Sequence, residues 1–223
     1  MDKAGMKIYS RFDALDTLET KQDLELLFEV LNSVKDKNGR NAVFTPFTLP
    51  CNINFEKMEA NNFQKFENET LPETYSKLAI EQPEAYLGAW EKWQEGIDKG
   101  FLKPQFHGRE HINIAIFKEK LNRKDEQFLT ALKNKSYTSI SDDNYPTMSS
   151  FAAFDFWDIN ENEKLKPIII DGLQKFEDVF GYKSIYFTPP VFNIHQSLFE
   201  TLSKEGIKFI DLALLRKEHQ GLN

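Results

Sequence analysis

Two histidines four residues apart are the strongest candidates for chemistry in this sequence. The motif reads His-Gly-Arg-Glu-His over residues 107–111 and contains half of the four histidines of the chain. Side chains four residues apart meet on one face of a helical turn, so the imidazoles of His107 and His111 could bind one ion. The pattern predicts a site for a divalent metal ion, with zinc first and cobalt or nickel as alternatives. A pair of surface or helix-capping histidines is the competing interpretation.

A hydrolytic metal site also needs carboxylates, as a third ligand or as a base that accepts a proton from water. Asp155 follows an apolar run and is the preferred third ligand or base, with a structural hydrogen-bonding role as the equal alternative. Asp13 follows the first strand-like run and is the second candidate, while the ordinary role of an aspartate there is to cap or start the following turn. Asp158 is better explained as a helix cap.

The same five residues also match the His-x-x-Glu-His pattern of some zinc peptidases, with Glu110 as the general base. That alternative needs a regular helix across both histidines, whereas Pro104 and Gly108 favour a turn after a strand. Other catalytic patterns are missing from the sequence, including a Gly-x-Ser-x-Gly elbow and a glycine-rich phosphate loop. Cys51 has no partner histidine in the sequence pattern and is expected to be an ordinary thiol.

Composition narrows the class of protein. The 223 residues are 40% hydrophobic and 28% charged, which is typical of a folded domain with its own core. The net charge of −7 and the lack of a basic cluster interleaved with aromatic residues argue against nucleic acid as a partner. A single cysteine allows no intramolecular disulfide, and no apolar run approaches the roughly 20 residues that span a bilayer. The N-terminal residues lack a secretory signal, so we expect a cytoplasmic protein without a membrane partner.

Short strand-like runs alternate with helical patterns along the chain. The six runs are Lys7–Phe12, Ala42–Thr48, Leu102–Phe106, Phe151–Phe156, Ile185–Thr188 and Ile207–Ile210. This alternation predicts an α/β fold with a parallel sheet, either open or closed into a (β/α) barrel of about six to seven strands. Residues 53–82 form a long excursion between strands, expected to be helical and able to form a lid or a cleft wall.

Several helices are marked by apolar stripes and by capping residues. The stripes comprise Leu24, Phe28 and Leu31 after the cap Thr20 and before Gly39; Tyr86, Trp90, Trp93 and Ile97 before Gly100; Ile169, Leu173, Phe176 and Phe180 before Gly181; and Leu198 with Leu202 before Gly206. Asp158 and Glu161 resemble a capping box. Pro167 should either begin the helix that follows or kink it. A further helical run, Ile112–Leu121, follows the two histidines.

Four segments in the same order along the chain carry a family resemblance. The stretch over residues 104–113, Pro-Gln-Phe-His-Gly-Arg-Glu-His-Ile-Asn, is the most specific, and residues 10–15, 180–190 and 202–210 support it. Together they resemble a bacterial family of polysaccharide (de)acetylase-like proteins related to the NodB-type carbohydrate esterases.

The resemblance implies a deformed (β/α) barrel that uses a divalent metal ion to hydrolyse N- or O-acetyl groups on sugars. In such proteins an aspartate and two histidines hold the metal, a second aspartate is the base and a late histidine is the acid. His107 and His111 match the two histidine ligands. Arg109, Trp157 and Pro189 are the expected contacts to an acetylated carbohydrate. The segment that begins Thr-Pro-Pro at residue 188 lacks the arginine of the family's Arg-x-Pro-Tyr-like pattern.

The departures from the family pattern concern its acid and base residues. The paired aspartates near the N-terminus and the late Ser-His-type segment have no match, so residues 1–223 are expected to be one domain that lacks the first strand and the C-terminal segment. A non-catalytic carbohydrate-recognition or assembly module on the same scaffold is therefore the alternative to a deacetylase. The exposed edges of an open sheet would allow such a module to pair with a second copy.

Overall fold

The computed structural model describes residues 17–137, 150–214, 218, 220 and 221. Its helices are α2 (Lys21–Ser33), α3 (Phe55–Ala60), α4 (Leu71–Glu81), α5 (Pro83–Tyr86), α6 (Ala89–Asp98), α7 (Ile114–Asn122), α8 (Glu126–Lys133), α9 (Asn162–Phe180) and α10 (Phe199–Lys204). Its strands are β1 (Phe47–Thr48), β2 (Cys51–Ile53), β3 (Asn68–Thr70), β4 (Gln105–Phe106), β5 (Tyr186–Phe187) and β6 (Phe209–Ile210). Three 3₁₀ turns, η2 (Ile159–Glu161), η3 (Pro190–Phe192) and η4 (Gln196–Leu198), complete the described elements.

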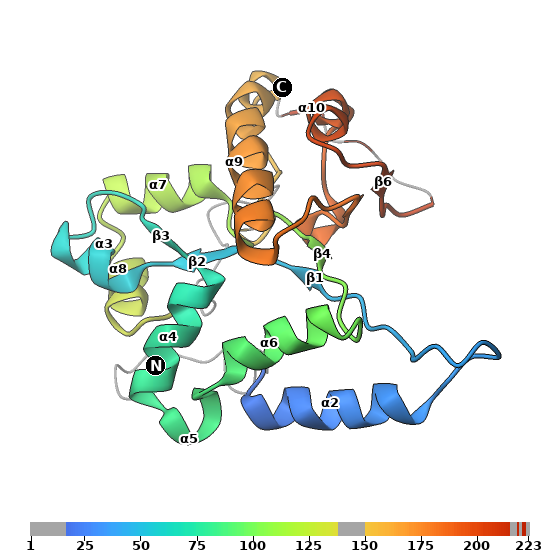
Figure 1. Ribbon diagram of the computed structural model, residues 1–223. Helices are drawn as coiled ribbons and strands as arrows, with labels where there is room; N and C mark the ends of the chain where they lie inside the picture. Colours follow the sequence, from blue (N-terminus) through green and yellow to red (C-terminus); the bar gives the residue numbers. More distant parts are fainter. Residues whose placement is uncertain (1–16, 138–149, 215–217, 219, 222–223) are drawn as a thin grey trace.

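Four of the strands form one parallel sheet in the order β1-β4-β5-β6. Neighbouring strands follow one another along this sheet in chain order, and helices connect each strand to the next (Figure 1). This confirms the predicted α/β class and its parallel sheet. The four strands fall within four of the predicted runs, those ending at Thr48, Phe106, Thr188 and Ile210. The run Lys7–Phe12 lies outside the described residues. Closure of the strands into a barrel remains a proposal.

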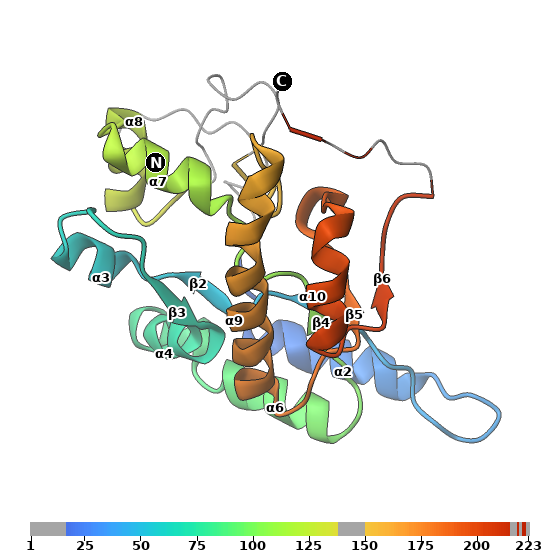
Figure 2. The same ribbon diagram turned by 90° about the horizontal axis from the view of Figure 1, so that it is seen from above.

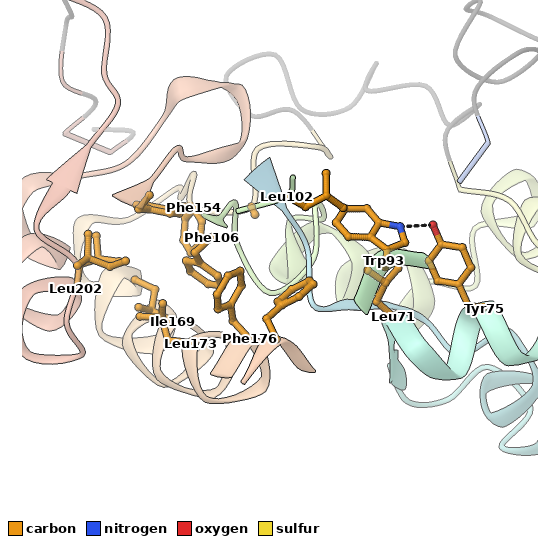
Figure 3. Close-up of a cluster of buried hydrophobic side chains, with 14 of the residues drawn as sticks. Leu71, Tyr75, Trp93, Leu102, Phe106, Phe154, Ile169, Leu173, Phe176 and Leu202 are labelled. Carbon is orange, nitrogen blue, oxygen red and sulfur yellow. Dashed lines mark hydrogen bonds between the residues drawn. The ribbon is translucent and has the colours of Figure 1, made fainter. Parts of the chain in front are cut away.

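One side of the sheet packs against α9 and buries aromatic rings. We call it the dry side. The register places Phe106 beside Phe187, and both rings are fully buried. Phe106 also meets Phe176 of α9 edge to face, with ring centroids 6.1 Å apart, and Figure 3 shows these side chains among the buried cluster. Helix α10 packs beside α9, as Figures 1 and 2 show from two directions. Part of the main core therefore lies between the sheet and these two helices, and the same cluster continues to α2, α4 and α6, with Leu24, Tyr75 and Trp93 among its members.

The opposite side of the same sheet carries aromatic rings that remain accessible. Phe47, Tyr186 and Phe209 are 39%, 42% and 50% exposed. Each alternates with a less exposed residue of its strand, half-buried Thr48 and Ile210 or buried Phe187, as side chains on a pleated strand must. The rings of Tyr186 and Phe209 stack on each other, with centroids 4.6 Å apart. Gln105 of β4 occupies the same row, and its Oε1 accepts hydrogen bonds from the backbone N–H groups of Ile185 and Tyr186.

The excursion over residues 53–82 is only partly helical. It contains α3 and α4 as predicted, but it also contributes β3, which pairs with β2 in an antiparallel two-stranded sheet. The three-residue run Asn-Glu-Thr of β3 is too polar and too short to be recognised as a strand from sequence. A second apolar cluster joins this region to α7 and α8, with Ile53, Met58, Phe117 and Phe128 among its buried members.

The predicted helix caps are confirmed, with two changes of boundary. Thr20 accepts from the N–H of Asp23 and begins α2, which ends at Ser33 instead of near Gly39. The stripe that begins at Tyr86 is not one helix, because Gly88, with φ of 83°, separates α5 from α6. Positive φ values suit glycine, which has no Cβ to clash.

Helix α9 continues through Pro167. The proline removes one backbone hydrogen bond. Burial of Ile169, Leu173 and Phe176 on the same helix outweighs that loss. The predicted capping box of Asp158 and Glu161 forms, and it starts the 3₁₀ turn η2 that leads into α9.

The predicted strand over Phe151–Phe156 is wrong. These residues are mostly buried, but they form successive turns, in which the N–H of Asp155 donates to the carbonyl of Ala152. The amide Nδ2 of Asn113 donates to the carbonyls of both Ala152 and Asp155 at 3.0 Å. A side chain therefore satisfies backbone groups that a neighbouring strand would otherwise satisfy. Among the helices that the structure describes, none has the length and apolar character needed to cross a membrane.

Candidate functional site

His107 lies directly after β4, at the carboxyl end of the parallel sheet. Its backbone N–H donates to the carbonyl of Thr48 in β1 at 3.0 Å. Its ring Nδ1 lies 2.6 Å from the carbonyl oxygen of Thr188, which follows β5. Because a carbonyl only accepts, Nδ1 carries the hydrogen, and the lone pair of the neutral ring is on Nε2. Histidines that bind metals are commonly oriented in this way, by donating their second ring N–H to a carbonyl or a carboxylate.

His111 lies next to His107, as the spacing of the motif predicts. The two ring centroids are 5.2 Å apart, and the ring planes are inclined by 59°. Two imidazoles that bind one ion at about 2.1 Å place their centroids roughly 5 Å apart. The Nδ1 atom of His111 is buried and has no hydrogen-bond partner of normal geometry among the described residues. A buried imidazole nitrogen that lacks a well-formed hydrogen bond is available to bind an ion.

Burial also controls the charge of the two imidazoles. It lowers the pKa of His107, against the opposing effect of the Thr188 carbonyl. Burial likewise lowers the pKa of His111, and backbone groups of His111 and Phe151 oppose the shift. Both rings therefore stay neutral at neutral pH, which is the form that binds metals.

Residues 107–113, which we call the histidine loop, are not helical. Gly108 has φ of 119°, and α7 begins only at Ile114. A Cβ at Gly108 would lie 3.4 Å from Pro190 and 3.5 Å from Phe154, so the loop packs closely beside the segment after β5. The zinc-peptidase alternative requires a helix across both histidines, and the fold does not provide one.

Arg109 and Glu110 form an ion pair inside the histidine loop. The Nε and Nη2 atoms of Arg109 donate to the two carboxylate oxygens of Glu110 at 2.6 and 2.7 Å, and Nη1 donates to Asp171 of α9 at 2.8 Å. The side chains of Arg109 and Glu110 are 13% and 3% exposed. Burial raises the pKa of Glu110, and the guanidinium opposes that shift. The guanidinium therefore contacts the protein, and a contact from Arg109 to substrate remains a prediction.

The structure does not bring Asp155 together with the two histidines as a metal site. No group of three potential ligands of the His, Cys, Asp or Glu type occurs among the residues that the structure describes. Asp155 is buried, and its Oδ1 accepts from the N–H of Phe156 at 3.0 Å. This contact matches the hydrogen-bonding alternative for Asp155. Asp13, the other candidate carboxylate, lies outside the described residues.

The two remaining predicted substrate contacts lie on different segments. Trp157 is half-buried and packs against Ile116 of α7. Pro189 is buried, directly after Thr188. The exposed residues beside it are Val191 and Phe192, whose φ values of 57° and 54° are unusual for residues other than glycine.

Sequence reasoning missed three groups that shape this site. Thr188 acts through its backbone carbonyl, which leaves no signal in the side-chain pattern. Asp171 is 62 positions from Arg109, so only the fold reveals their contact. Asn113 was accessible from sequence as a helix cap, because asparagine is favoured directly before a helix and its Oδ1 accepts from Ala115 and Ile116.

A cleft of about 380 Å³ lies away from the histidine loop, between the β2–β3 sheet, α3 and α4. Its charged lining residues pair with one another. Lys77 binds Glu56 and Glu69, and Lys135 binds Glu56 and Glu81. These pairings explain the charges of the cleft without a ligand.

Comparison of the chain with protein-family models, with curated proteins and with solved structures found no match. The resemblance to the polysaccharide deacetylases therefore depends on the motifs of the chain itself.

Proposed function

We propose that the chain is a polysaccharide-deacetylase-like protein that holds a divalent metal ion with His107 and His111 and removes acetyl groups from a carbohydrate. The observation that carries this proposal is the hydrogen bond from Nδ1 of His107 to the carbonyl of Thr188. It leaves Nε2 as the free lone pair, beside a second buried imidazole.

The residues of the chain fit such an ion as two neutral nitrogen ligands. When bound, a divalent ion polarises a carbonyl group and lowers the pKa of water. His107 and His111 would hold it at the carboxyl end of the sheet, where parallel α/β enzymes place their active sites. Asp155 and Asp13 are the carboxylates that we propose as third ligand or base.

Arg109, Trp157 and Pro189 remain the proposed contacts to the carbohydrate. The imidazole rings of His107 and His111 would exclude water from one side of a bound sugar. Exclusion of water strengthens polar contacts.

A non-catalytic carbohydrate-recognition or assembly module is the second candidate. One observation favours it, namely that the described residues do not complete a three-ligand group around the histidines. A cytoplasmic location and pairing with a second copy through the sheet edges also remain predictions. Cell fractionation and light scattering on the purified protein test them.

Metal content and acetate release test the proposal together. The purified chain is loaded with zinc, cobalt or nickel, desalted and analysed, and then incubated with acetylated chito- and xylo-oligosaccharides. We expect about one ion per chain and none in His107→Ala or His111→Ala, because each variant removes one of two ligands. His195→Ala is the matched control, since His195 is also a buried histidine but caps the separate turn η4.

The outcomes separate the two candidates. Acetate release that is lost with the metal supports the deacetylase. Metal and oligosaccharide binding without acetate release supports the module. Absence of metal from the loaded wild type, or retention of metal by both histidine variants, would contradict the proposed site.

A further inference from the structure

The histidine loop has no regular secondary structure, so contacts to other elements must fix its two imidazoles. Four hydrogen bonds hold its backbone and the ring of His107. His107 contacts Thr48 and Thr188, the carbonyl of Arg109 accepts from the N–H of Cys51 at 3.1 Å, and the N–H of Asn113 donates to Ser150 at 2.8 Å. The loop is therefore anchored to β1, to β2, to the residue after β5 and to Ser150.

The centre of the loop is tied to α9 by charged groups. The guanidinium of Arg109 binds both oxygens of Glu110 and one oxygen of Asp171, and all three distances are between 2.6 and 2.8 Å. A planar guanidinium in a two-pronged contact with a carboxylate fixes direction as well as distance. Since Glu110 directly precedes His111, this contact acts next to the second imidazole.

The backbone of α9 also approaches the loop unusually closely. A Cβ built on Gly172 would lie 2.8 Å from Cβ of Arg109 and 3.0 Å from Cζ of Phe106. Only glycine allows this approach, and it directly follows Asp171. Two consecutive residues of α9 thus contact Arg109, one through charge and the other through close packing.

We propose that Arg109, Glu110 and Asp171 form a positioning network, which holds the histidine loop against α9 so that His107 and His111 converge on one ion. This inference rests on the proposed metal site. None of the three residues is a ligand, and each acts through the loop that carries the ligands. Buried groups that orient the ligands of a metal commonly contribute about 10- to 100-fold to its affinity.

The first test uses Asp171→Asn, with Asp178→Asn as the matched control. Both aspartates lie on α9, and Asp178 accepts only a local hydrogen bond from Gln174 at 2.9 Å among the contacts described. We expect Asp171→Asn to weaken Co²⁺ binding about tenfold and to alter the visible absorption of bound Co²⁺. Asp178→Asn should bind Co²⁺ as the wild type does.

The second test removes the ion pair as a unit, by Arg109→Met with Glu110→Gln. Removing Arg109 alone would leave the buried carboxylate of Glu110 without this partner and destabilise the fold, whereas replacing both residues avoids that penalty. We expect a loss of Co²⁺ affinity of about tenfold or more, together with a far-UV circular dichroism spectrum like that of the wild type.

The metal-free protein provides an independent measurement. Imidazole ¹⁵N shifts report which ring nitrogen carries the hydrogen, and His107 of the wild type should show hydrogen on Nδ1 alone. The double variant should show a mixture of both forms, because its loop no longer holds the ring against Thr188.

The outcomes distinguish the network from the site itself. If the wild type binds no Co²⁺, or if His107→Ala binds it normally, then the metal site is wrong and the network falls with it. If the wild type binds Co²⁺ while Asp171→Asn and the folded double variant bind it equally well, then the site stands and the network is overturned.

Discussion

The two sides of the four-stranded sheet are made from adjacent residues and have opposite environments. Phe106 and Phe187 are buried under α9, whereas Tyr186 and Phe209 of the neighbouring row remain about half exposed. Strand geometry sends successive side chains to opposite sides, so the helix that covers one side decides which aromatic rings become core. For these four aromatic rings, burial therefore follows the side of the sheet on which each ring lies.

The side of the sheet that packs against α9 is linked to the histidine loop through that helix. Gly172 and Asp171 of α9 contact Arg109 of that loop, so the helix that buries Phe106 also shapes the proposed site. A closed (β/α) barrel would bury the exposed rings of Phe47, Tyr186 and Phe209 in its interior. The proposed family fold therefore predicts that further side chains cover these rings.

The largest expected effect on stability comes from removing a buried ring on the dry side. Phe106→Ala should lower the free energy of unfolding by about 3–5 kcal/mol, because it removes a fully buried ring and leaves a cavity. Phe209→Ala, on the exposed side, should cost about 1 kcal/mol or less. Urea denaturation of both variants measures the difference. Equal losses would show that the two sides are equally buried.

Gly172→Ala tests the close approach of α9. Alanine favours helices over glycine by about 1 kcal/mol, so helix propensity alone predicts stabilisation. The added Cβ would instead meet Arg109 at 2.8 Å, and such overpacking costs about 1–3 kcal/mol. We expect a lower melting temperature, measured against Gln174→Ala at an exposed position of the same helix. A raised melting temperature would mean that the contact is loose.

Titration of Cys51 in β2 tests how well α9 shields the strand next to the histidine loop. Burial raises the pKa of the Cys51 thiol to about 12, and Asp171 and Lys175 of α9 are near enough to influence it. The folded state thus retains the proton. The protonated thiol makes its full contribution to the free energy of unfolding below the ordinary thiol pKa of about 8.5. This contribution is lost as the pH rises towards 12.

Thiol labelling near pH 8.5 checks this expectation. Native Cys51 should react at least about tenfold more slowly than the unfolded chain, because the thiolate is the reactive form. A Cys51→Ser protein that carries Phe209→Cys should react rapidly while folded. Fast labelling of native Cys51 would show that solvent reaches the start of β2.

The smallest effect is expected from Tyr186→Thr on the exposed side. Threonine keeps the strand preference and removes an exposed ring, so stability should change by only about 0.5 kcal/mol. If the exposed row mediates contact with a second copy, light scattering should show less self-association. Unchanged association would exclude Tyr186 from such an interface.

Sequence patterns located the elements whose signal is local. Thr20, Asp158 and Gly181 mark helix ends because their capping contacts span only a few residues. The run Phe151–Phe156 misled because apolar character indicates burial and does not distinguish a strand from buried turns. The side chain that satisfies two carbonyls of these turns is that of Asn113, about 40 positions away.

The candidate site divides in the same way. His107 and His111 meet because their spacing is local, and the motif alone predicted this. Their second contacts, to Thr188 and through Arg109 to Asp171, depend on which strands and helices become neighbours. The metal-binding role of the pair stays a prediction.

Asn113 links two parts of the chain that neither helix nor sheet joins. Its Oδ1 accepts from the first N–H groups of α7, and its Nδ2 donates to the turns over Phe151–Phe156. The side-chain amide of Asn113 thus hydrogen-bonds to both segments. We therefore expect the start of α7 and these turns to open as one cooperative unit. In native-state hydrogen exchange, the amides of Ile116 and Asp155 should then exchange with similar free energies of opening, and Asn113→Ala should raise both exchange rates together.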